Sequence, residues 1–448
     1  MLSKWSEITL SDIGSKTSRA FAMGPFGSNI TSDNYRDSGI PVIRGINLGD
    51  VGDAPFNTRG LTYVDDAKAK QLSSSQAFAN DIVFVAQGTV GKVGLIPIDS
   101  QYRCFLLSQN LMKVSVDPDL ADPAYVFYYF RSPFGQHQIR SRVNSTGVPC
   151  ISQPLTSLRS FKIVLPPLSE QRAIASILGA LDDKIELNRK MSGTLEAMAR
   201  ALFKSWFVDF NPVRAKMGGR ETGLSDEIIA LFADSFIADG LPDGWTIGNI
   251  NDLCDSISSG GTPARMNGQY WNSGTIPWYK TGEMKDEFLV GPSEYITELG
   301  LTNSSCKLWP TGTILFALYA SPTVGRLGVL TTPGTSNQAA AGLSPNGSTG
   351  FAYLFQTLFA ARQDIQHIAV GAAQQNINLG VLRNHKVVLP PSALRLKYSA
   401  LMQPLFDRRQ NLQFESLTLT NLRDALLPKL ISGKLRVAEA ERILEKSA

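Results

Sequence analysis

Two glycine-rich segments that end in a basic residue are the parts of the sequence best suited to bind a polyanion. They are residues 86–92 (AQGTVGK) and 319–326 (YASPTVGR), and each follows a short β-branched run. Glycine lets a backbone approach a phosphate closely, and Lys92 or Arg326 could bind a phosphate or the edge of a guanine. Gln87 has the paired donor and acceptor that suit adenine. The two segments predict contacts with double-stranded DNA.

A second pair of segments, 43–47 (IRGIN) and 279–283 (YKTGE), has similar chemistry. The candidate DNA contacts from all four segments are Arg44, Asn47, Gln87, Thr89, Lys92, Lys280, Thr281, Ser321, Thr323 and Arg326. The alternative is that the glycines only form hairpin turns and that the basic residues are ordinary surface charge. The sequence leaves both interpretations open for each residue.

Three motifs that resemble catalytic or cofactor sites are incomplete. Residues 86–93 resemble a phosphate-binding loop, but Ala86 replaces its first glycine and Val93 replaces the Ser or Thr that would bind magnesium. A nuclease-like carboxylate pair of Asp243 and Glu283 has no counterpart in the matching first-half segment. Residues 211–214 (NPVR) lack the aromatic residue of an amino-methyltransferase site. We therefore predict no catalytic residue in this chain.

The candidate segments belong to an internal repeat with a period of about 230 residues. The matching pairs are 5–13 with 245–253, 39–48 with 274–284, 81–96 with 313–330, and 162–167 with 386–391. A solenoid would repeat every ~20–50 residues. The longer period predicts two homologous domains.

Each repeat begins with a mixed region and ends in a long helical one. Short β-branched runs at 83–85, 94–96 and 162–165 are bounded by turn residues and predict strands. The segment 124–131 is compatible with either a helix or a strand. We therefore predict the α+β fold class for both domains.

Apolar residues after Pro167 and Pro391 recur at alternating spacings of four and three, as in a coiled coil. The predicted seam residues are Ile174, Leu178, Leu181, Ile185, Leu195, Leu202, Met402, Leu405, Leu412, Leu419 and Leu426. Polar residues occupy five further positions of the same series, namely Asn188, Ser192, Arg409, Ser416 and Arg423. We expect the two helices to pair antiparallel, which would relate the domains by a pseudo-twofold axis. The alternative is that each helix packs only on its own domain.

These patterns divide the chain into six segments. We predict a first domain at 1–167, a first long helix at 168–210, a connector at 211–244, a second domain at 245–391, a second long helix at 392–435 and a C-terminal tail at 436–448. In the connector, 216–220 is expected to be flexible and 228–237 to be a short helix.

Composition favours a globular, intracellular protein without a metal site. The chain has 448 residues, of which 43% are hydrophobic and 18% charged, with a net charge of +4. No apolar run is long enough for a membrane span, and residues 1–7 lack the features of a signal peptide. Four cysteines without a CxxC pair and only three histidines argue against a zinc site. We expect a cytoplasmic location.

A pair of long helices with one domain at each end would act as a ruler for a periodic partner. A helix of about 34 residues is roughly 50 Å long, or about 15 base pairs of duplex DNA. Two domains with different loop residues would read different half-sites. The predicted target is therefore a bipartite, asymmetric site in double-stranded DNA.

The chain resembles the specificity (S) subunits of type I restriction-modification enzymes over nearly its whole length. The resemblance rests on residues 165–174 (LPPLSEQRAI), 181–188 (LDDKIELN) and 201–207 (ALFKSWF), and on 261–263, 270–271, 274–278 and 281–283 at the start of the second domain. The second repeat departs from the pattern, because 391–397 (PSALRLK) lacks the Glu-Gln pair, whereas 422–433 is typical.

The resemblance implies two target-recognition domains separated by two long antiparallel helices. It implies that the helices set the spacing and dock two methyltransferase (M) subunits, and that motor-nuclease (R) subunits join for cleavage. S-adenosylmethionine, ATP and magnesium would then be held by the partner subunits, with none in this chain. The missing Glu-Gln pair in the second repeat implies that the two M subunits need not dock in the same way.

Two other classes of function are weighed against DNA recognition. A single-chain nuclease or methyltransferase would need a carboxylate cluster or a cofactor loop, and would show magnesium-dependent turnover. An adaptor that binds protein or glycan through its two domains would lack the steep salt dependence of phosphate binding.

Overall fold

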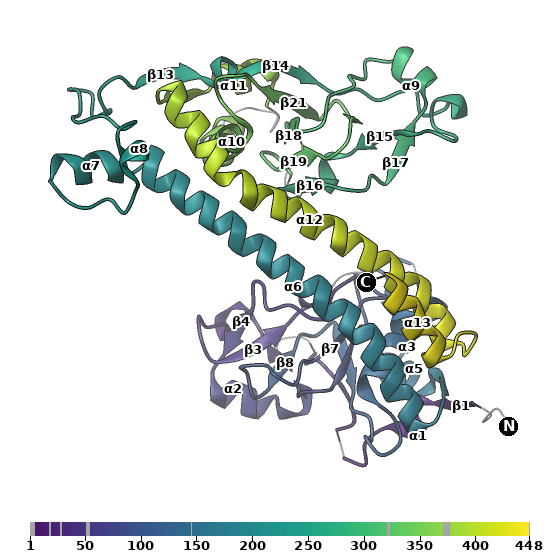
Figure 1. Cartoon of the computed structure of the whole chain (residues 1–448). Helices are drawn as coiled ribbons and strands as arrows, with labels where there is room; N and C mark the ends of the chain where they lie inside the picture. Colours follow the sequence, from purple (N-terminus) through teal and green to yellow (C-terminus); the bar gives the residue numbers. More distant parts are fainter. Residues whose placement is uncertain are drawn as a thin grey trace. The chain divides into compact units, whose positions relative to one another are not determined.

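The computed structural model describes residues 5–17, 19–26, 29–50, 54–144, 146–319, 323–370 and 377–447, with only the backbone of 369–370 and 446–447. The chain forms two compact units. Unit 1 comprises Met1–Glu186 and Thr418–Ala448, and unit 2 comprises Leu187–Leu417. Each unit contains one mixed domain and part of each of two long helices, α6 (Leu168–Phe207) and α12 (Ser392–Ile431) (Figure 1). The predicted α+β fold with a long helix after each domain is confirmed.

Unit 1 contains two four-stranded sheets, in the orders β2-β9-β6-β7 and β4-β3-β8-β5, and the pairs β1-β12 and β10-β11. Its strands are β1 (Ser6–Thr9), β2 (Phe21–Met23), β3 (Ile40–Ile43), β4 (Thr62–Val64), β5 (Gln76–Ala77), β6 (Ile82–Val85), β7 (Val93–Leu95), β8 (Phe105–Leu107), β9 (Leu111–Val114), β10 (Val143–Asn144), β11 (Cys150–Ile151) and β12 (Lys162–Leu165). Its shorter helices are α1 (Leu10–Ile13), α2 (Asp66–Gln71), α3 (Pro123–Arg131), α4 (Pro133–Arg140), α5 (Pro154–Ser160) and α13 (Val437–Ser447).

Unit 2 contains a five-stranded sheet, β14-β21-β18-β19-β16, a three-stranded sheet, β17-β15-β20, and the pair β13-β22. Its strands are β13 (Thr246–Asn249), β14 (Cys254–Ser259), β15 (Ile276–Tyr279), β16 (Glu287–Leu289), β17 (Glu294–Ile296), β18 (Ile314–Ala317), β19 (Leu327–Leu330), β20 (Thr335–Ser336), β21 (Ala340–Pro345) and β22 (Lys386–Leu389). Its shorter helices are α7 (Asn211–Met217), α8 (Asp226–Ile229), α9 (Glu298–Thr302), α10 (Phe351–Val370) and α11 (Leu379–Asn384).

The two domains share strand register, which confirms the internal repeat. Antiparallel β3 and β4 pair Ile40 with Val64, and antiparallel β15 and β17 pair Ile276 with Ile296. In both domains the same central strand also has a parallel neighbour, β8 in the first domain and β20 in the second. The strand that precedes each long helix pairs antiparallel with the first strand of its domain, as β12 with β1 and β22 with β13.

A helix between the sheet and α6 forms the core of unit 1. Helix α3 begins after Asp122, whose side chain accepts the Tyr125 N–H at 2.9 Å, and Pro123 occupies its first turn. Every residue from Tyr125 to Arg131 is buried, and Tyr125 to Phe130 belong to one apolar core with residues of β6, β9 and α6. This resolves segment 124–131 as a helix. It is apolar all round because both of its faces are covered.

The long helices run antiparallel in unit 2, where Asn188 of α6 contacts Ser416 of α12 and Glu196 pairs with Arg409, so residue numbers rise along one helix as they fall along the other. In unit 1, Asp182 of α6 pairs with Arg423 of α12. Six seam residues are buried, namely Ile174, Leu178, Leu181, Met402, Leu412 and Leu426. Five are partly buried, namely Ile185, Leu195, Leu202, Leu405 and Leu419. The helices therefore pack on each other as well as on their own domains.

The connector differs from its prediction. The predicted helix 228–237 is wrong, because α8 ends at Ile229 and the chain then turns so that Phe232 contacts Trp206 with ring centroids 5.2 Å apart. The predicted flexible stretch 216–220 is also wrong at its start, because Met217 ends α7 and Lys216 pairs with Asp234 at 2.6 Å. The burial of aromatic side chains in the folded unit determines the conformation of this segment. The predicted tail also contains a helix, α13.

Glu287 at the start of β16 supplies a pH-dependent prediction. Burial raises the pKa of its carboxyl group, and this outweighs the opposing charges of Lys285 and Arg409. The folded state therefore holds its proton at pH values where the unfolded chain has lost it, so this group costs stability as the pH rises above its ordinary pKa of 4.5.

We expect Glu287→Gln to raise the urea midpoint of unit 2 at pH 7 and to change it little at pH 4. A control at the exposed Glu298 should show no such difference between the two pH values. An equal effect of Glu287→Gln at both pH values would contradict the prediction.

Among the described residues, no helix combines the length and the apolarity that a membrane span requires.

Candidate nucleic-acid interface

The predicted glycine-rich segment of unit 1 is the hairpin between β6 and β7. Gln87, Gly88 and Thr89 are exposed at its tip, and Gly88 and Gly91 have φ angles of +92° and +113° that favour glycine. The Gln136 side chain of α4 donates a hydrogen bond to the Gly91 carbonyl at 2.8 Å. The hairpin is thereby fixed at one end while its polar tip faces solvent.

Unit 2 repeats this arrangement in the hairpin between β18 and β19. Gly325 has a φ angle of +82°, and the Gln366 side chain of α10 donates to the Val324 carbonyl at 2.6 Å. A helix glutamine therefore anchors the hairpin in both domains. Neither glutamine was among the predicted site residues. Their common spacing of 230 residues is the signal that could have found them.

The hairpin β10-β11 lies beside the glycine-rich hairpin of unit 1. The Gly88 N–H donates to the Pro149 carbonyl at 2.8 Å, and Gln87 pairs with Cys150. The end of α4 places the exposed Arg140 next to Gly91. The result is an exposed surface with amide, hydroxyl and guanidinium groups, which suits phosphate and base edges.

Two of the predicted contacts in unit 1 are used inside the protein. Asn47 is buried; its side chain accepts the Arg44 N–H at 2.9 Å and donates to the Asn57 and Arg59 carbonyls at 3.1 and 3.0 Å. The prediction that Asn47 contacts bases is therefore wrong in this structure, because its hydrogen-bonding groups hold the loop. Lys92 pairs with Asp50 at 2.9 Å and is largely buried.

Asn47→Ala is expected to destabilise unit 1 by about 1–3 kcal/mol, because it leaves buried backbone groups without partners. The exposed Gln87→Ala should change stability by less than about 0.5 kcal/mol. Urea unfolding of both variants, followed by hydrogen exchange of residues 40–60, measures the difference. Equal stability of the two variants would show that the Asn47 bonds do not hold this loop.

The predicted contacts in unit 2 also divide into exposed and buried positions. Thr281 is buried, which corrects its prediction as a base contact. Thr323 donates to the Tyr319 carbonyl at 3.0 Å, and Arg326 is half-buried at the end of the hairpin. Lys280 is exposed at 41% of its side chain. Ser321 lies outside the described residues.

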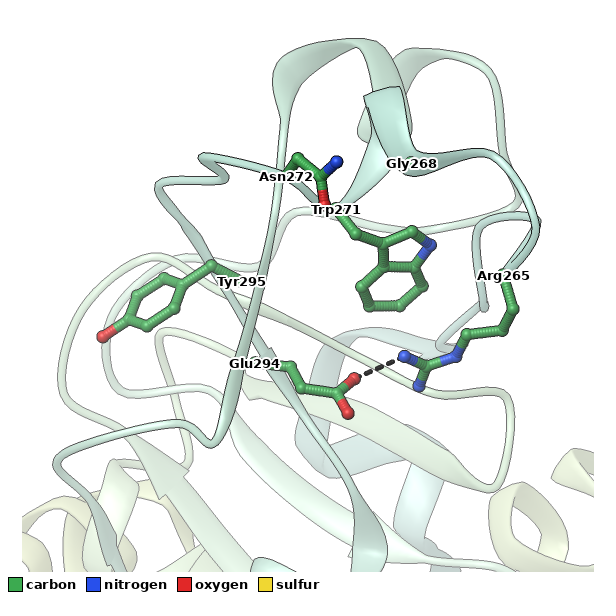
Figure 2. A pocket seen from close by; sticks show the side chains of 6 residues that line it. All are labelled: Arg265, Gly268, Trp271, Asn272, Glu294 and Tyr295. Atoms are coloured by element: carbon green, nitrogen blue, oxygen red, sulfur yellow. Dashed lines mark hydrogen bonds and ion pairs between the residues drawn. The ribbon is translucent and has the colours of Figure 1, made fainter.

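A shallow recess of about 400 Å³ lies on the three-stranded sheet of unit 2. It is lined by Arg265, Gly268, Trp271, Asn272, Glu294 and Tyr295 (Figure 2). Figure 2 shows the Arg265 guanidinium directed at Glu294, with the Trp271 indole above. Sequence reasoning missed this recess, although an arginine near two aromatic residues at 265–271 is a signal for nucleic-acid binding.

Glu294 is charged at neutral pH. Burial acts to raise the pKa of its carboxyl group, but hydrogen bonds from Lys280 and Arg265 outweigh that effect and hold the pKa below its usual value. The Lys280 ammonium lies 2.6 Å from one carboxylate oxygen and Arg265 lies 2.5 Å from the other. The carboxylate is thus shared by two cations, of which only Arg265 lines the recess.

Within the described ranges, no three His, Cys, Asp or Glu side chains are grouped so that they could hold a metal ion. The exposed loops of both domains offer groups for hydrogen bonding and ion pairing.

Comparison with known proteins places the chain in a family. The family described as "Type I restriction modification DNA specificity domain" matches residues 28–197 and 242–404, one match in each repeat. The chain is 24% identical to the type I restriction enzyme HindI specificity subunit of Haemophilus influenzae, over 97% of this chain and 100% of that protein. It is 26% identical to the MjaIX specificity subunit of Methanocaldococcus jannaschii, over 86% and 84% of the two chains.

A solved structure agrees in fold. The S subunit of the type I restriction-modification system from M. genitalium aligns with a TM-score of 0.54 and 16% identity, covering 95% of this chain and 96% of that one. Both family matches, which together span most of the chain, coincide with a domain and part of the long helix that follows it. The chain therefore belongs to the family of type I restriction-modification specificity subunits.

Proposed function

We propose that each domain of this specificity subunit reads one half of a bipartite, asymmetric site in double-stranded DNA. The observation that carries this proposal is the repeated scaffold, in which the strand register is the same but the exposed side chains differ. One scaffold can present two different sets of donors and acceptors. Two such sets in a single chain would select two different half-sites in a defined order.

The helix pair sets the distance between the half-sites. Helices α6 and α12 have 40 residues each, so each is about 60 Å long, which corresponds to about 18 base pairs. Buried polar layers, Asp182 with Arg423 and Glu196 with Arg409, tie the helices together in each unit. A polar residue in a coiled-coil seam favours one register over others.

The same subunit docks the M and R subunits of the complex and is itself noncatalytic. Exposed apolar residues at Leu187, Met191 and Met198 form a stripe along one face of α6, and such a stripe suits a protein partner. S-adenosylmethionine, ATP and magnesium are supplied by the partner subunits in this proposal, and adenine is flipped into a pocket of the M subunit. The assembly works in the cytoplasm.

The absence of the Glu-Gln pair at the start of α12 does not require the two M subunits to dock differently. In unit 1, Gln171 is buried, donates to the Pro166 carbonyl at 2.9 Å and accepts the Asp122 N–H at 2.9 Å. It therefore braces the start of α3. In unit 2, Arg395 reaches Thr349, next to the start of α10, at 3.4 Å. The two different residues brace equivalent helices, so Gln171 of the Glu-Gln pair serves the domain interior.

Genome-wide mapping of methylated adenine tests the proposal in cells that express the chain with an M subunit. The expected result is one motif with two unlike halves and a constant gap. Exchange of residues 1–167 for another such domain should change one half only. Changes in both halves, binding without salt dependence, or magnesium-dependent turnover by the chain alone would overturn the proposal.

A further inference from the structure

We propose that Arg265 reads a guanine in the half-site of the second domain, with Glu294 as the residue that positions it. This inference rests on the proposed function and assigns a specific base contact to the recess of unit 2. Three observations carry it. They are the way Arg265 is held, the charge of its surroundings and the contrast with the first domain.

Arg265 packs against two indole rings whose planes are 87° apart. Its guanidinium carbon lies 3.8 Å from the Trp271 ring centroid and 4.5 Å from that of Trp278. Trp278 is buried, and its indole N–H donates to the Gly261 carbonyl at 2.9 Å, so this support is rigid. A guanidinium packed against two such rings has few orientations open to it, which reduces the entropy lost when it forms two parallel hydrogen bonds.

The Glu294 carboxylate fixes the direction in which the guanidinium points. The Arg265 Nη1 donates to Glu294 Oε2 at 2.5 Å, and among the described residues this is the side chain's only hydrogen-bond partner. The Arg265 side chain is still 47% exposed. Of its five N–H donors, enough remain for a bidentate contact with a ligand.

The carboxylate makes guanine a better partner than a phosphate. A phosphate at Arg265 would lie next to the Glu294 carboxylate, which hydrogen bonds from Lys280 and Arg265 keep ionised, so the attraction of the phosphate to the arginine would be weakened. The guanine edge carries no net charge and presents O6 and N7 as two adjacent acceptors in the major groove. An arginine already neutralised by a carboxylate retains its directional donors, so it suits the guanine edge.

The equivalent position in the first domain has different chemistry. Trp278 pairs with Glu294 across β15 and β17, and the residues at the same register of β3 and β4 are Val42 and Thr62. The first domain therefore has neither the aromatic support nor the carboxylate at this place. A difference confined to side chains on a shared scaffold is what two readers of different half-sites require.

The test uses the complex of this chain with its M subunit. Adenine methylation mapping of the wild-type complex first defines the motif, and exchange of residues 245–391 assigns one half-site to the second domain. Arg265→Gln should then reduce the preference for one G·C pair in that half-site by about 5- to 150-fold, with other positions unchanged. Glu294→Gln should weaken the preference at the same position by a smaller factor.

Arg200→Gln is the matched control. Arg200 is 48% exposed, lies 3.9 Å from the Phe359 ring centroid and pairs with Glu196, so it has the same kind of surroundings on α6. It should leave the motif unchanged.

A binding measurement separates base reading from a structural role. Duplexes in which 7-deazaguanine replaces the guanine lack the N7 acceptor, so they should bind the wild-type complex more weakly but bind the Arg265→Gln complex no worse than normal DNA. The inference is overturned by an unchanged motif, by a uniform loss of affinity for all sequences, or by an equal deaza effect on both complexes. It is also overturned by a half-site without a G·C pair. In each of those cases a bipartite motif would still support the proposed function, whereas its absence would contradict that function itself.

Discussion

Arg423→Met is expected to lower the free energy of unfolding of unit 1 by about 3–5 kcal/mol. The Arg423 and Asp182 side chains are 4% and 6% exposed, and their charged atoms lie 2.5 Å apart. Asp182 also accepts a hydrogen bond from the buried Tyr128 hydroxyl at 2.8 Å. Removal of the arginine leaves a buried carboxylate without its counter-charge, and the cost is the desolvation of that charge.

Hydrogen exchange of α3 and α6 peptides in a urea series measures this loss in the full-length chain. Arg436→Met is the control, because Arg436 forms a surface ion pair with Glu170 at 3.1 Å and is 43% exposed; its loss should cost less than about 1 kcal/mol. The double variant Asp182→Leu with Arg423→Met should recover most of the stability. Equal losses for Arg423→Met and Arg436→Met would show that the buried pair is not a strong constraint.

The two buried pairs also select the register of the helices. Arg409 and Arg423 are 14 residues apart, and so are Glu196 and Asp182, which is two heptads on each helix. A slide of one heptad would bring Arg423 opposite Ala175 or Arg189, neither of which is acidic. The single register in which both arginines meet acids is therefore favoured.

Removal of one heptad from both helices between these layers is expected to shorten the gap in the DNA site by about three base pairs. Residues 186–192 of α6 and 413–419 of α12 face each other in this register and lie between the two buried pairs. Seven residues of helix correspond to about 10 Å. Both ion-pair layers are retained, so the helices can still pair and each domain keeps its own residues.

Methylation mapping of the shortened chain with its M subunit gives the new gap directly. Deletion of 186–192 alone is the control, because it leaves the two arginines with only one acid in register, and it should abolish methylation. An unchanged gap after the double deletion would show that the helix pair does not set the spacing. A changed base sequence in either half would show that the domains and the spacer are not independent.

Several features could be predicted from the sequence because they depend on local chemistry. Pro166 and Pro167 end a strand, and the alternating apolar residues after them define a helix, so α6 begins at Leu168 as expected. Gly88 and Gly91 have the positive φ angles that a hairpin of this composition needs. The period of the repeat located matching strands in both domains, because homologous segments place the same residues in the same register.

Other features depend on atoms that lie far apart in the sequence. Asn47 looked like a base contact, but the backbone of residues 57 and 59 folds over it and uses its amide. Residues 228–237 were expected to be a helix, but α8 ends at Ile229 and Phe232 packs on Trp206 of α6. Arg265 was not among the predicted contacts, because its suitability for reading a base depends on Trp278 and Glu294. These two residues lie on two strands that meet Arg265 only in the folded domain.

The sequence alone determined the repeat, the domain order, the long helices and the residue types available for binding DNA. Periodicity and turn chemistry act over a few neighbouring residues, so these features can be predicted without the fold. Tertiary structure alone decides which of those side chains are exposed and which are consumed, since burial and hydrogen bonding are set by partners tens of residues away. The physical reason is that a polar group serves either the protein interior or a ligand, and only the folded chain shows which partner it has.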